Sequence, residues 1–377
     1  MLRRAAHASF ADPALASRCG LDRAFHLRFD AGRSVDSLVE AYQGLGCVEY
    51  AEPNRIVRSL SAAALYPNDI YFNWLWGLDN REKFGFGDRW TPKPDADIDA
   101  PEAWDITTGD SSVIVAILDS GCKTSHPELA GRFWRNPGET PDNGSDDDGN
   151  GYTDDMLGWD FWYDDNVPED SGGHGTAVTG VVGANGNNGV GHAGVDWQCK
   201  LMIAKVMRND GDGTNITTLG EAVQYAADNG ADVMNISLGD DRGSVFLRNA
   251  VDYAYNLGVV IVAASGNDNL PQVLFPAAYG NVIAVGSTDP DDRRSDHFGP
   301  DTSSEGSNYG AALDVVAPGN NIFCLNYIDD TLFSEGASGT SLASPHVAGA
   351  TALLLQAKPG TKPLEGRDIL QNSADPV

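Results

Sequence analysis

Val113-Ile114-Val115-Ala116-Ile117-Leu118 is a continuous apolar run of strand length, and Asp119-Ser120-Gly121 closes it. A strand that is apolar at every position is typical of a parallel sheet with both faces covered by helices. Further apolar runs alternate along the chain with helical stretches, as crossover connections between parallel strands require. The expected strands span 113–118, 201–207, 232–237, 258–264 and 281–286, and the expected helices lie near 217–229 and 244–257. The sequence therefore predicts an α/β fold with a mainly parallel central sheet.

The residues of segment 338–349 are of the kind that position a nucleophilic side chain. Its small residues form a turn that delivers Ser341 to the first turn of a helix, which is apolar from Val347 to Leu355. A helix N-terminus has unpaired backbone N–H groups and partial positive charge, so it can stabilise an oxyanion. Taken alone, Ser341 has an alternative interpretation as an ordinary cap of a buried helix.

A candidate acid and a candidate base occur upstream. Asp119 ends the buried strand, where open α/β sheets gather their active sites. His174 lies between Gly173 and Gly175 at the start of a helical stretch, 177–184. The other six histidines lack such a setting. Each residue by itself also has an ordinary reading, because Asp119 fits a helix-cap or turn position and His174 fits a solvated loop.

The three residues follow one another in the order Asp, His, Ser, one of the orders known for catalytic triads. The segments 117–121, 173–176 and 339–349 resemble the motifs of the subtilisin-like serine peptidases, the subtilase family, on its thermitase and proteinase K side. The resemblance runs from about Asp69 to the C-terminus. It implies a three-layer fold, an endopeptidase that forms an acyl-enzyme, and polypeptide substrates.

The resemblance also assigns roles. Ser341 is expected to be the nucleophile, His174 the general base and then acid, and Asp119 the group that sets the histidine tautomer. Asn267, which follows the apolar run 259–264, matches the family's oxyanion donor, with the Ser341 backbone N–H as its partner. A pseudoprotease that only binds peptides, and a non-enzymatic acidic calcium-binding protein, remain the competing readings.

Substrate recognition is expected to use mainly backbone groups. By resemblance, the edge at residues 237–239 pairs with an extended peptide by strand addition. Residues 237–239 and residues 263–266 would form the two walls of the pocket that holds the side chain of the residue before the scissile bond. Gly239 and Gly266 leave the slot open, which predicts a broad preference for large apolar or aromatic residues. The expected substrate-binding residues are Ser237, Leu238, Gly239, Ala264, Ser265 and Gly266.

The composition is strongly acidic, with 54 acidic against 25 basic residues and a net charge of −29. Such a surface repels nucleic acid and anionic membranes, and it suits salty or calcium-rich surroundings. No apolar run reaches the length of a membrane span. The sequence predicts no nucleic-acid partner and no organic cofactor; the segment 189–194 fits a dinucleotide-binding pattern, but it does not lie between a strand and a helix. We expect a monomer.

Part of the acidic content predicts structural calcium. Alternating oxygens and a glycine at the sixth position make residues 146–151 similar to a calcium loop, although Leu157 stands where an EF-hand needs its closing glutamate. An acidic surface loop is the alternative. The resemblance implies further ligands around segment 158–161 and a tighter site. The expected ligands are Asp146, Asp148, Asn150, Asp155, Asp160 and Asp165, and, at the tighter site, Asp69, Glu128, Asn188 and the carbonyl groups of Asn185, Val190 and His192.

The N-terminal part differs from the rest of the chain. We expect a strand at 25–29 and a helix at 35–45, with residues 48–54 leading to a second strand. This resembles the last part of a subtilase propeptide, an inhibitor and folding chaperone, although a permanently attached small domain is the alternative. The expected division is 1–24 unassigned, 25–60 propeptide, 61–68 processing junction and 69–377 catalytic domain.

Two expectations concern the ends of the chain and its compartment. Residues 1–20 lack the apolar core of a signal peptide, and the sequence looks like a piece of a longer precursor that the resemblance implies is secreted. Cys122, Cys199 and Cys324 are an odd number in the expected catalytic domain. One disulfide with a free thiol, or three buried thiols, are both open, and a thiol nucleophile is not expected.

Overall fold

The structure is a computed structural model, and it describes residues 2–4, 17, 25–27, 35–52, 64–81, 90–209, 213–298, 304–328 and 333–375. The chain divides into two compact units, Met1–Ala62 and Ala63–Val377. In the first unit, β1 (Leu2–Arg4) pairs antiparallel with β2 (Phe25–Leu27), and α2 spans Val35–Gln43. The expected second strand after residue 54 lies outside the described residues.

The second unit is built around a seven-stranded sheet with the order β4-β5-β3-β6-β7-β8-β9. All neighbouring strands of this sheet run parallel. The strands are β3 (Ile114–Asp119), β4 (Gly158–Asp160), β5 (Lys200–Lys205), β6 (Val233–Ile236), β7 (Val260–Ala264), β8 (Val282–Thr288) and β9 (Val315–Pro318). A separate antiparallel pair is formed by β10 (Ile322–Leu325) and β11 (Phe333–Ala337).

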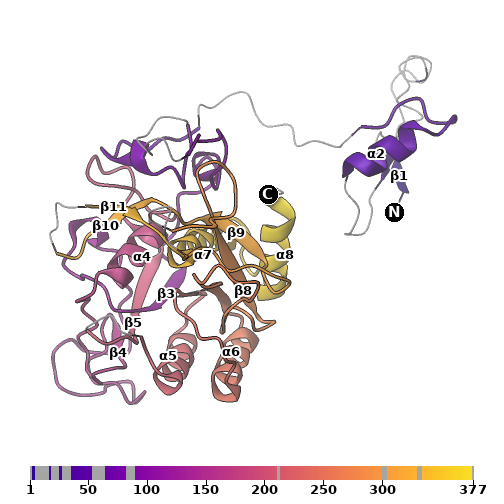
Figure 1. The fold of residues 1–377 in the computed structure, drawn as a ribbon. Helices are drawn as coiled ribbons and strands as arrows, with labels where there is room; N and C mark the ends of the chain where they lie inside the picture. The colour runs from indigo at the N-terminus through magenta and orange to yellow at the C-terminus, as the bar shows by residue number, and fades with distance from the viewer. Residues whose placement is uncertain are drawn as a thin grey trace. The chain divides into compact units, whose positions relative to one another are not determined.

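Helices cover both faces of the sheet (Figure 1), which explains its continuous apolar strands. Ala116 and Leu118 pack with the helices α5 (Ile216–Asp228) and α6 (Val245–Leu257). Val115 and Ile117 point the other way and pack with α4 (His174–Gly183) and α7 (Thr340–Ala357). The remaining helical segments are η2 (Phe72–Trp74), α3 (Ala100–Trp104), η3 (Pro127–Leu129) and α8 (Pro363–Ser373).

The three-layer α/β fold predicted from the sequence is confirmed. The expected strands agree with β3, β5, β6, β7 and β8 to within two residues at most ends, and the two expected helices agree with α5 and α6. The strands β4 and β9 were not predicted, because runs of three or four residues show no usable periodicity. Within the described residues, no helix combines the length and apolarity needed to cross a bilayer.

Candidate active site

The carboxyl ends of three neighbouring strands carry the predicted site (Figure 1). Asp119 is the last residue of β3, Ser237 directly follows β6, and Asn267 lies shortly after β7. In the register of the sheet, Leu118 pairs with Ile236 on β6, and Ile236 pairs with Ala263 on β7. Because adjacent strands lie about 4.8 Å apart, the three side chains reach the same edge of the sheet.

Asp119 and His174 form a hydrogen-bonded pair. The His174 Nδ1 atom lies 2.7 Å from Asp119 Oδ1, which also accepts from the Ser120 backbone N–H at 2.7 Å. The Asp119 side chain is fully buried, whereas 38% of the His174 side chain is exposed. The negative charge of Asp119 raises the pKa of His174 above its usual value, against the lowering effect of desolvation. The pair therefore has a buried anion that orients an accessible imidazole and makes it more basic.

The start of α4 is held by glycines and by Asp170. Gly173 caps the helix in the left-handed region, at φ 89°, and a Cβ at Gly175 would collide with the carbonyl oxygen of Gly121. The Asp170 carboxylate accepts from the Gly173 backbone N–H at 2.9 Å. Asp170 was not predicted from the sequence, although a carboxylate near a helix N-terminus is a recognisable pattern. These contacts set the position of His174.

Ser341 is the second residue of α7, and it exchanges two hydrogen bonds with Ser237, which directly follows β6. Its hydroxyl donates to the Ser237 carbonyl oxygen at 3.2 Å, and the Ser237 hydroxyl donates to the Ser341 carbonyl oxygen at 2.9 Å. Beneath them, the Asn235 amide donates to the Ser237 hydroxyl at 2.9 Å and accepts from the Ser344 hydroxyl at 2.7 Å. Asn235 and Ser344 are fully buried and were not identified from the sequence, because their role exists only once α7 packs on β6.

Asn267 is oriented by Thr340. The Asn267 Oδ1 atom accepts from the Thr340 backbone N–H at 2.9 Å and from the Thr340 hydroxyl at 2.8 Å. The Asn267 Nδ2 group therefore points away from Thr340. A Cβ built on Gly339 would lie 3.2 Å from Asn267 Nδ2 and 3.7 Å from the Ser341 backbone nitrogen. The space left by the missing side chain of Gly339 is thus flanked by the two donors predicted for an oxyanion.

The residues predicted to bind substrate lie on both sides of Ser341. Ala264 is the buried last residue of β7, and Ser265 accepts from the Leu274 backbone N–H at 2.9 Å. The Gly266 N–H donates to the Thr340 hydroxyl at 3.1 Å. On the other side, residues 237–239 leave β6, with Leu238 packed partly against the core.

Comparisons with known proteins agree with this architecture. Residues 110–377 match the subtilase family of peptidases. The chain belongs to the subtilase family. It is 36% identical over 345 residues to the thermophilic serine proteinase of Bacillus sp. strain AK1, covering 91% of this chain and 72% of that protein. It is 38% identical over 280 residues to thermitase of Thermoactinomyces vulgaris, covering 74% of this chain and 87% of that protein.

Two further similarities bear on environment and fold. The halolysin-like extracellular serine protease Nep of Natrialba magadii is 34% identical over 330 residues, covering 87% of this chain and 51% of that protein. A solved protease from Pseudoalteromonas arctica PAMC 21717 superposes with a TM-score of 0.63 at 28% identity, covering 82% of this chain and 93% of that one. The protein is therefore a subtilisin-like serine endopeptidase, which acts on polypeptides.

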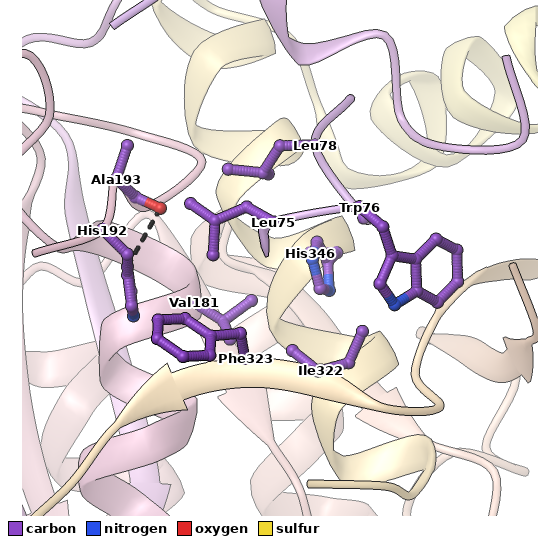
Figure 2. A pocket seen from close by; sticks show the side chains of 10 residues that line it. Leu75, Trp76, Leu78, Val181, His192, Ala193, Ile322, Phe323 and His346 are labelled. Atoms are coloured by element: carbon purple, nitrogen blue, oxygen red, sulfur yellow. Dashed lines mark hydrogen bonds between the residues drawn. The ribbon is translucent and has the colours of Figure 1, made fainter. Parts of the chain in front are cut away.

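Two other histidines of the subtilase are buried in a different setting. His192 and His346 line a small, largely apolar cavity with Trp76 and Phe323, between α4, α7 and β10 (Figure 2). Burial lowers the pKa of both imidazoles to about 4, so both are neutral at neutral pH. The pKa of His174, in contrast, is raised, and its side chain is partly exposed. This difference agrees with the prediction that His174, rather than His192 or His346, is the general base.

The three cysteines of the second unit are buried as thiols. Cys122, Cys199 and Cys324 are buried and form no disulfide, which corresponds to the second of the two arrangements left open by the sequence. Burial raises the pKa of the Cys122 thiol, so little thiolate forms near Asp119. This agrees with the expectation that no thiol acts as nucleophile.

The tighter of the two expected calcium sites contains two buried carboxylates. Asp69 Oδ2 accepts from the Asn187 N–H at 2.6 Å, whereas Oδ1 is buried and accepts no hydrogen bond from the residues that the structure describes. The Glu128 carboxylate accepts from the Asn188 amide at 3.3 Å. Burial, with a smaller contribution from the charge of Asp69, raises the pKa of Glu128 to about 7. The backbone of Asn185, Val190 and His192 belongs to the loop that carries Asn188.

The second cluster of carboxylates includes Asp148 of the acidic loop 146–151 and two residues from outside that loop. Carboxylate oxygens of Glu139, Asp148 and Asp155 lie within 4.8 Å of one another, the one such group among the described residues. The Asn150 amide donates to both aspartates, at 3.2 and 3.1 Å. Asp146, in contrast, accepts backbone N–H groups of its own loop. Glu139 was not predicted from the sequence, because the closing glutamate of a calcium loop follows the loop, whereas here the fold supplies a glutamate that precedes it.

Asp160 and Asp165 have other partners. The buried ammonium group of Lys205 lies 3.1 Å from Asp160 Oδ2 and donates to the Glu169 carbonyl oxygen at 2.8 Å. Asp165 accepts the Val167 N–H at 2.9 Å through its side chain and the Asp160 N–H at 2.8 Å through its carbonyl oxygen. Here a lysine side chain already supplies the positive charge next to Asp160.

Proposed function

We propose that this subtilase hydrolyses peptide bonds through an acyl-enzyme intermediate on Ser341, with His174 as general base and then acid. The observation that carries the proposal is the 2.7 Å pair between His174 and fully buried Asp119, at the sheet edge that also holds Ser341 and Asn267. A base oriented by a buried anion, next to a hydroxyl on a helix N-terminus, is the arrangement that activates serine.

In the proposed reaction, His174 Nε2 takes the hydroxyl proton of Ser341 as its oxygen attacks the substrate carbonyl carbon. The oxyanion lies beside Gly339, where Asn267 Nδ2 and the Ser341 N–H can donate to it. His174 then protonates the departing amine, and a water molecule hydrolyses the ester in the reverse order of steps. The substrate lies extended along residues 237–239, so backbone pairing gives broad specificity beyond the residue before the scissile bond.

A fluorophosphonate probe tests this proposal, because it reacts covalently with an activated serine. We expect labelling of the protein after removal of the first unit, with the label on the peptide that contains Ser341 and its loss in Ser341→Ala. Ser344, on the same helix but fully buried against Asn235, is the internal control and should stay unlabelled. Absence of label from the processed protein would favour a pseudoprotease, and a label retained in Ser341→Ala would assign the nucleophile to another residue.

The first unit is proposed to be a propeptide that inhibits the enzyme and is removed by self-cleavage near residues 61–68. The division of the chain at Ala62 and Ala63, and the strand pair and helix of the first unit, support this assignment. Secretion to the extracellular space and a monomeric enzyme complete the proposal; the relative Nep is named as extracellular. A new N-terminus in this range, formed by the active protein and not by Ser341→Ala, is the expected result.

Calcium is proposed as a structural ligand at two places. Asp69, Glu128 and Asn188 fit a hard cation. Asp69 has a buried carboxylate oxygen that accepts no hydrogen bond from the described residues, and the Asp69 and Glu128 carboxylates both contact the loop at 187–188. Glu139, Asp148 and Asp155 provide a second set of oxygens. A bound ion would offset the repulsion between these carboxylates and tie their loops together, and it takes no part in the proposed chemical steps.

Chelation of calcium is expected to lower the melting temperature. With free calcium at 100 times Kd, one site stabilises the folded state by about 2.7 kcal/mol, which corresponds to about 4 °C for a unit of this size. Calorimetry in the Ser341→Ala background avoids self-digestion. Glu128→Gln and Glu139→Gln should each reduce the effect of the chelator, while Asp368→Asn on the surface of α8 should not. An unchanged melting temperature in EDTA would refute calcium stabilisation.

A further inference from the structure

The space between the two predicted walls of the substrate pocket contains the side chain of Leu274. A Cβ built on Gly266 would lie 2.7 Å from Leu274 Cγ and 2.8 Å from its Cδ1. A Cβ built on Gly239 would lie 3.1 Å from Leu274 Cβ and 3.6 Å from its Cδ1. One isobutyl group therefore spans the gap that the two glycines leave. Leu274 shares the space beside these glycines with the Asn308 amide, which a Cβ on Gly266 would also meet, and the Phe275 carbonyl oxygen, 3.0 Å from the Cβ position of Gly239.

The backbone around Leu274 is fixed to both walls. The Leu274 N–H donates to the Ser265 carbonyl oxygen at 2.9 Å, on the wall that follows β7. The next residue, Phe275, exchanges two hydrogen bonds of 2.9 Å with Asp240, directly after the other wall. Leu274 is half-buried, and these backbone hydrogen bonds fix the position of its Cα and Cβ atoms between the two walls. The fold thus places the Leu274 side chain at this slot.

The slot lies beside the proposed nucleophile. Ser237, before the first wall, accepts the Ser341 hydroxyl hydrogen bond, and Gly266, in the second wall, donates to Thr340, the neighbour of Ser341. The side chain of the substrate residue whose own carbonyl group Ser341 attacks, the residue before the scissile bond, must enter between these walls. A phenylalanine ring would have to occupy the volume of Leu274, and overpacking of this kind is costly.

We propose that Leu274 is a specificity-determining residue that restricts the position before the scissile bond to small side chains such as alanine. This inference rests on the proposed function of Ser341, and it reverses the preference for large residues expected from the sequence. Small residues need no space beyond the glycine faces, so they bind without displacing Leu274. Large residues lose transition-state binding because the pocket cannot close around them.

The test compares two peptide p-nitroanilides that are identical except for alanine or phenylalanine before the scissile bond. We expect the unchanged enzyme to favour alanine in kcat/KM by more than about tenfold, and Leu274→Ala to shift the ratio toward phenylalanine by about 10–200-fold. Leu274→Met keeps the volume and should keep the ratio. Leu364→Ala, the same truncation at an exposed position of α8, should also keep it.

The outcomes separate this inference from the proposed function. If fluorophosphonate labels Ser341 but the unchanged enzyme prefers phenylalanine, the inference is overturned and the nucleophile stands. If Leu274→Ala folds and leaves the ratio unchanged, the inference is equally overturned. If Leu274→Ala fails to fold, Leu274→Val, which removes one methylene, replaces it in the comparison. Loss of labelling in the unchanged, processed enzyme instead refutes the proposed function.

Discussion

Asp119→Asn is expected to lower kcat by about 10⁴-fold, the size of loss that this change causes in serine peptidases with the same three groups. The buried carboxylate makes two hydrogen bonds through one oxygen, from His174 and from Ser120. An asparagine can keep its oxygen there, but its NH₂ group then lies buried at the position of Asp119 Oδ2, which has no hydrogen-bond partner among the described residues. If the amide turns instead, it donates to His174 Nδ1 and leaves the proton on Nε2. Both orientations remove the charge that stabilises the imidazolium.

The pH profile of the same variant distinguishes this electrostatic role from a structural one. In the unchanged enzyme, kcat/KM should fall as the pH drops through the raised pKa of His174, because a protonated imidazole cannot accept the serine proton. Removing the Asp119 charge removes the main cause of the raised pKa, so the acid limb should move to lower pH. Asp368→Asn, exposed on α8, should change neither kcat nor the limb. A loss of less than tenfold, or an unmoved limb, would contradict the role assigned to Asp119.

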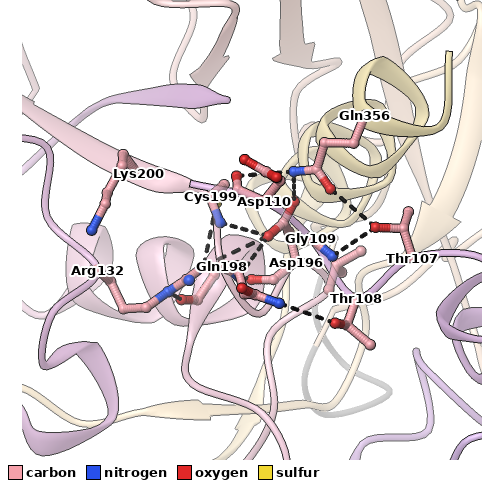
Figure 3. Close-up of polar contacts among 12 residues, drawn as sticks. Thr107, Thr108, Gly109, Asp110, Arg132, Asp196, Gln198, Cys199, Lys200 and Gln356 are labelled. Carbon is pink, nitrogen blue, oxygen red and sulfur yellow. Dashed lines mark hydrogen bonds and ion pairs between the residues drawn. The ribbon is translucent and has the colours of Figure 1, made fainter. Parts of the chain in front are cut away.

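Asp196→Ala is expected to destabilise the fold by about 3–5 kcal/mol, because it leaves a buried charge without its partner. Arg132 lies 3.7 Å from Asp196, and the side chains are 5% and 0% exposed (Figure 3). Asp196 also accepts the backbone N–H groups of Gln198 and Cys199, at 2.8 and 2.7 Å, and the Gln356 amide of α7 at 3.1 Å. The pair therefore joins the loop before β5 to the end of the helix that carries Ser341.

The measurement is the melting temperature in the Ser341→Ala background, which should fall by about 5–8 °C. A double-mutant cycle provides the control. Asp196→Ala combined with Arg132→Met should lose less than the sum of the two single changes, because the second change removes the unpaired charge. Asp196→Asn keeps the acceptor for the backbone N–H groups and should lose less than Asp196→Ala. A fall below 1 °C in Asp196→Ala would show that the pair contributes little.

The parts of the site that could be predicted share one property: each is specified by its own neighbours in the chain. Asp119 ends an apolar run, His174 stands between two glycines, and Ser341 opens an apolar helix. The parallel topology places strand ends together without further information, so Asp119 and Asn267 could be expected at one edge. The sheet order and the pair between His174 and Asp119 agree with that expectation.

The sequence by itself determined the α/β fold and its family, because strand-length apolar runs, small-residue turns and motif order are local patterns. Only the tertiary structure decided how Glu139 joins Asp148 and Asp155, how Lys205 meets Asp160, and how Leu274 fills the slot between Gly239 and Gly266. These contacts join segments that are separated along the chain, and no local pattern records which side chain will lie opposite another. The space beside a glycine is read correctly only when the residue that occupies it is known.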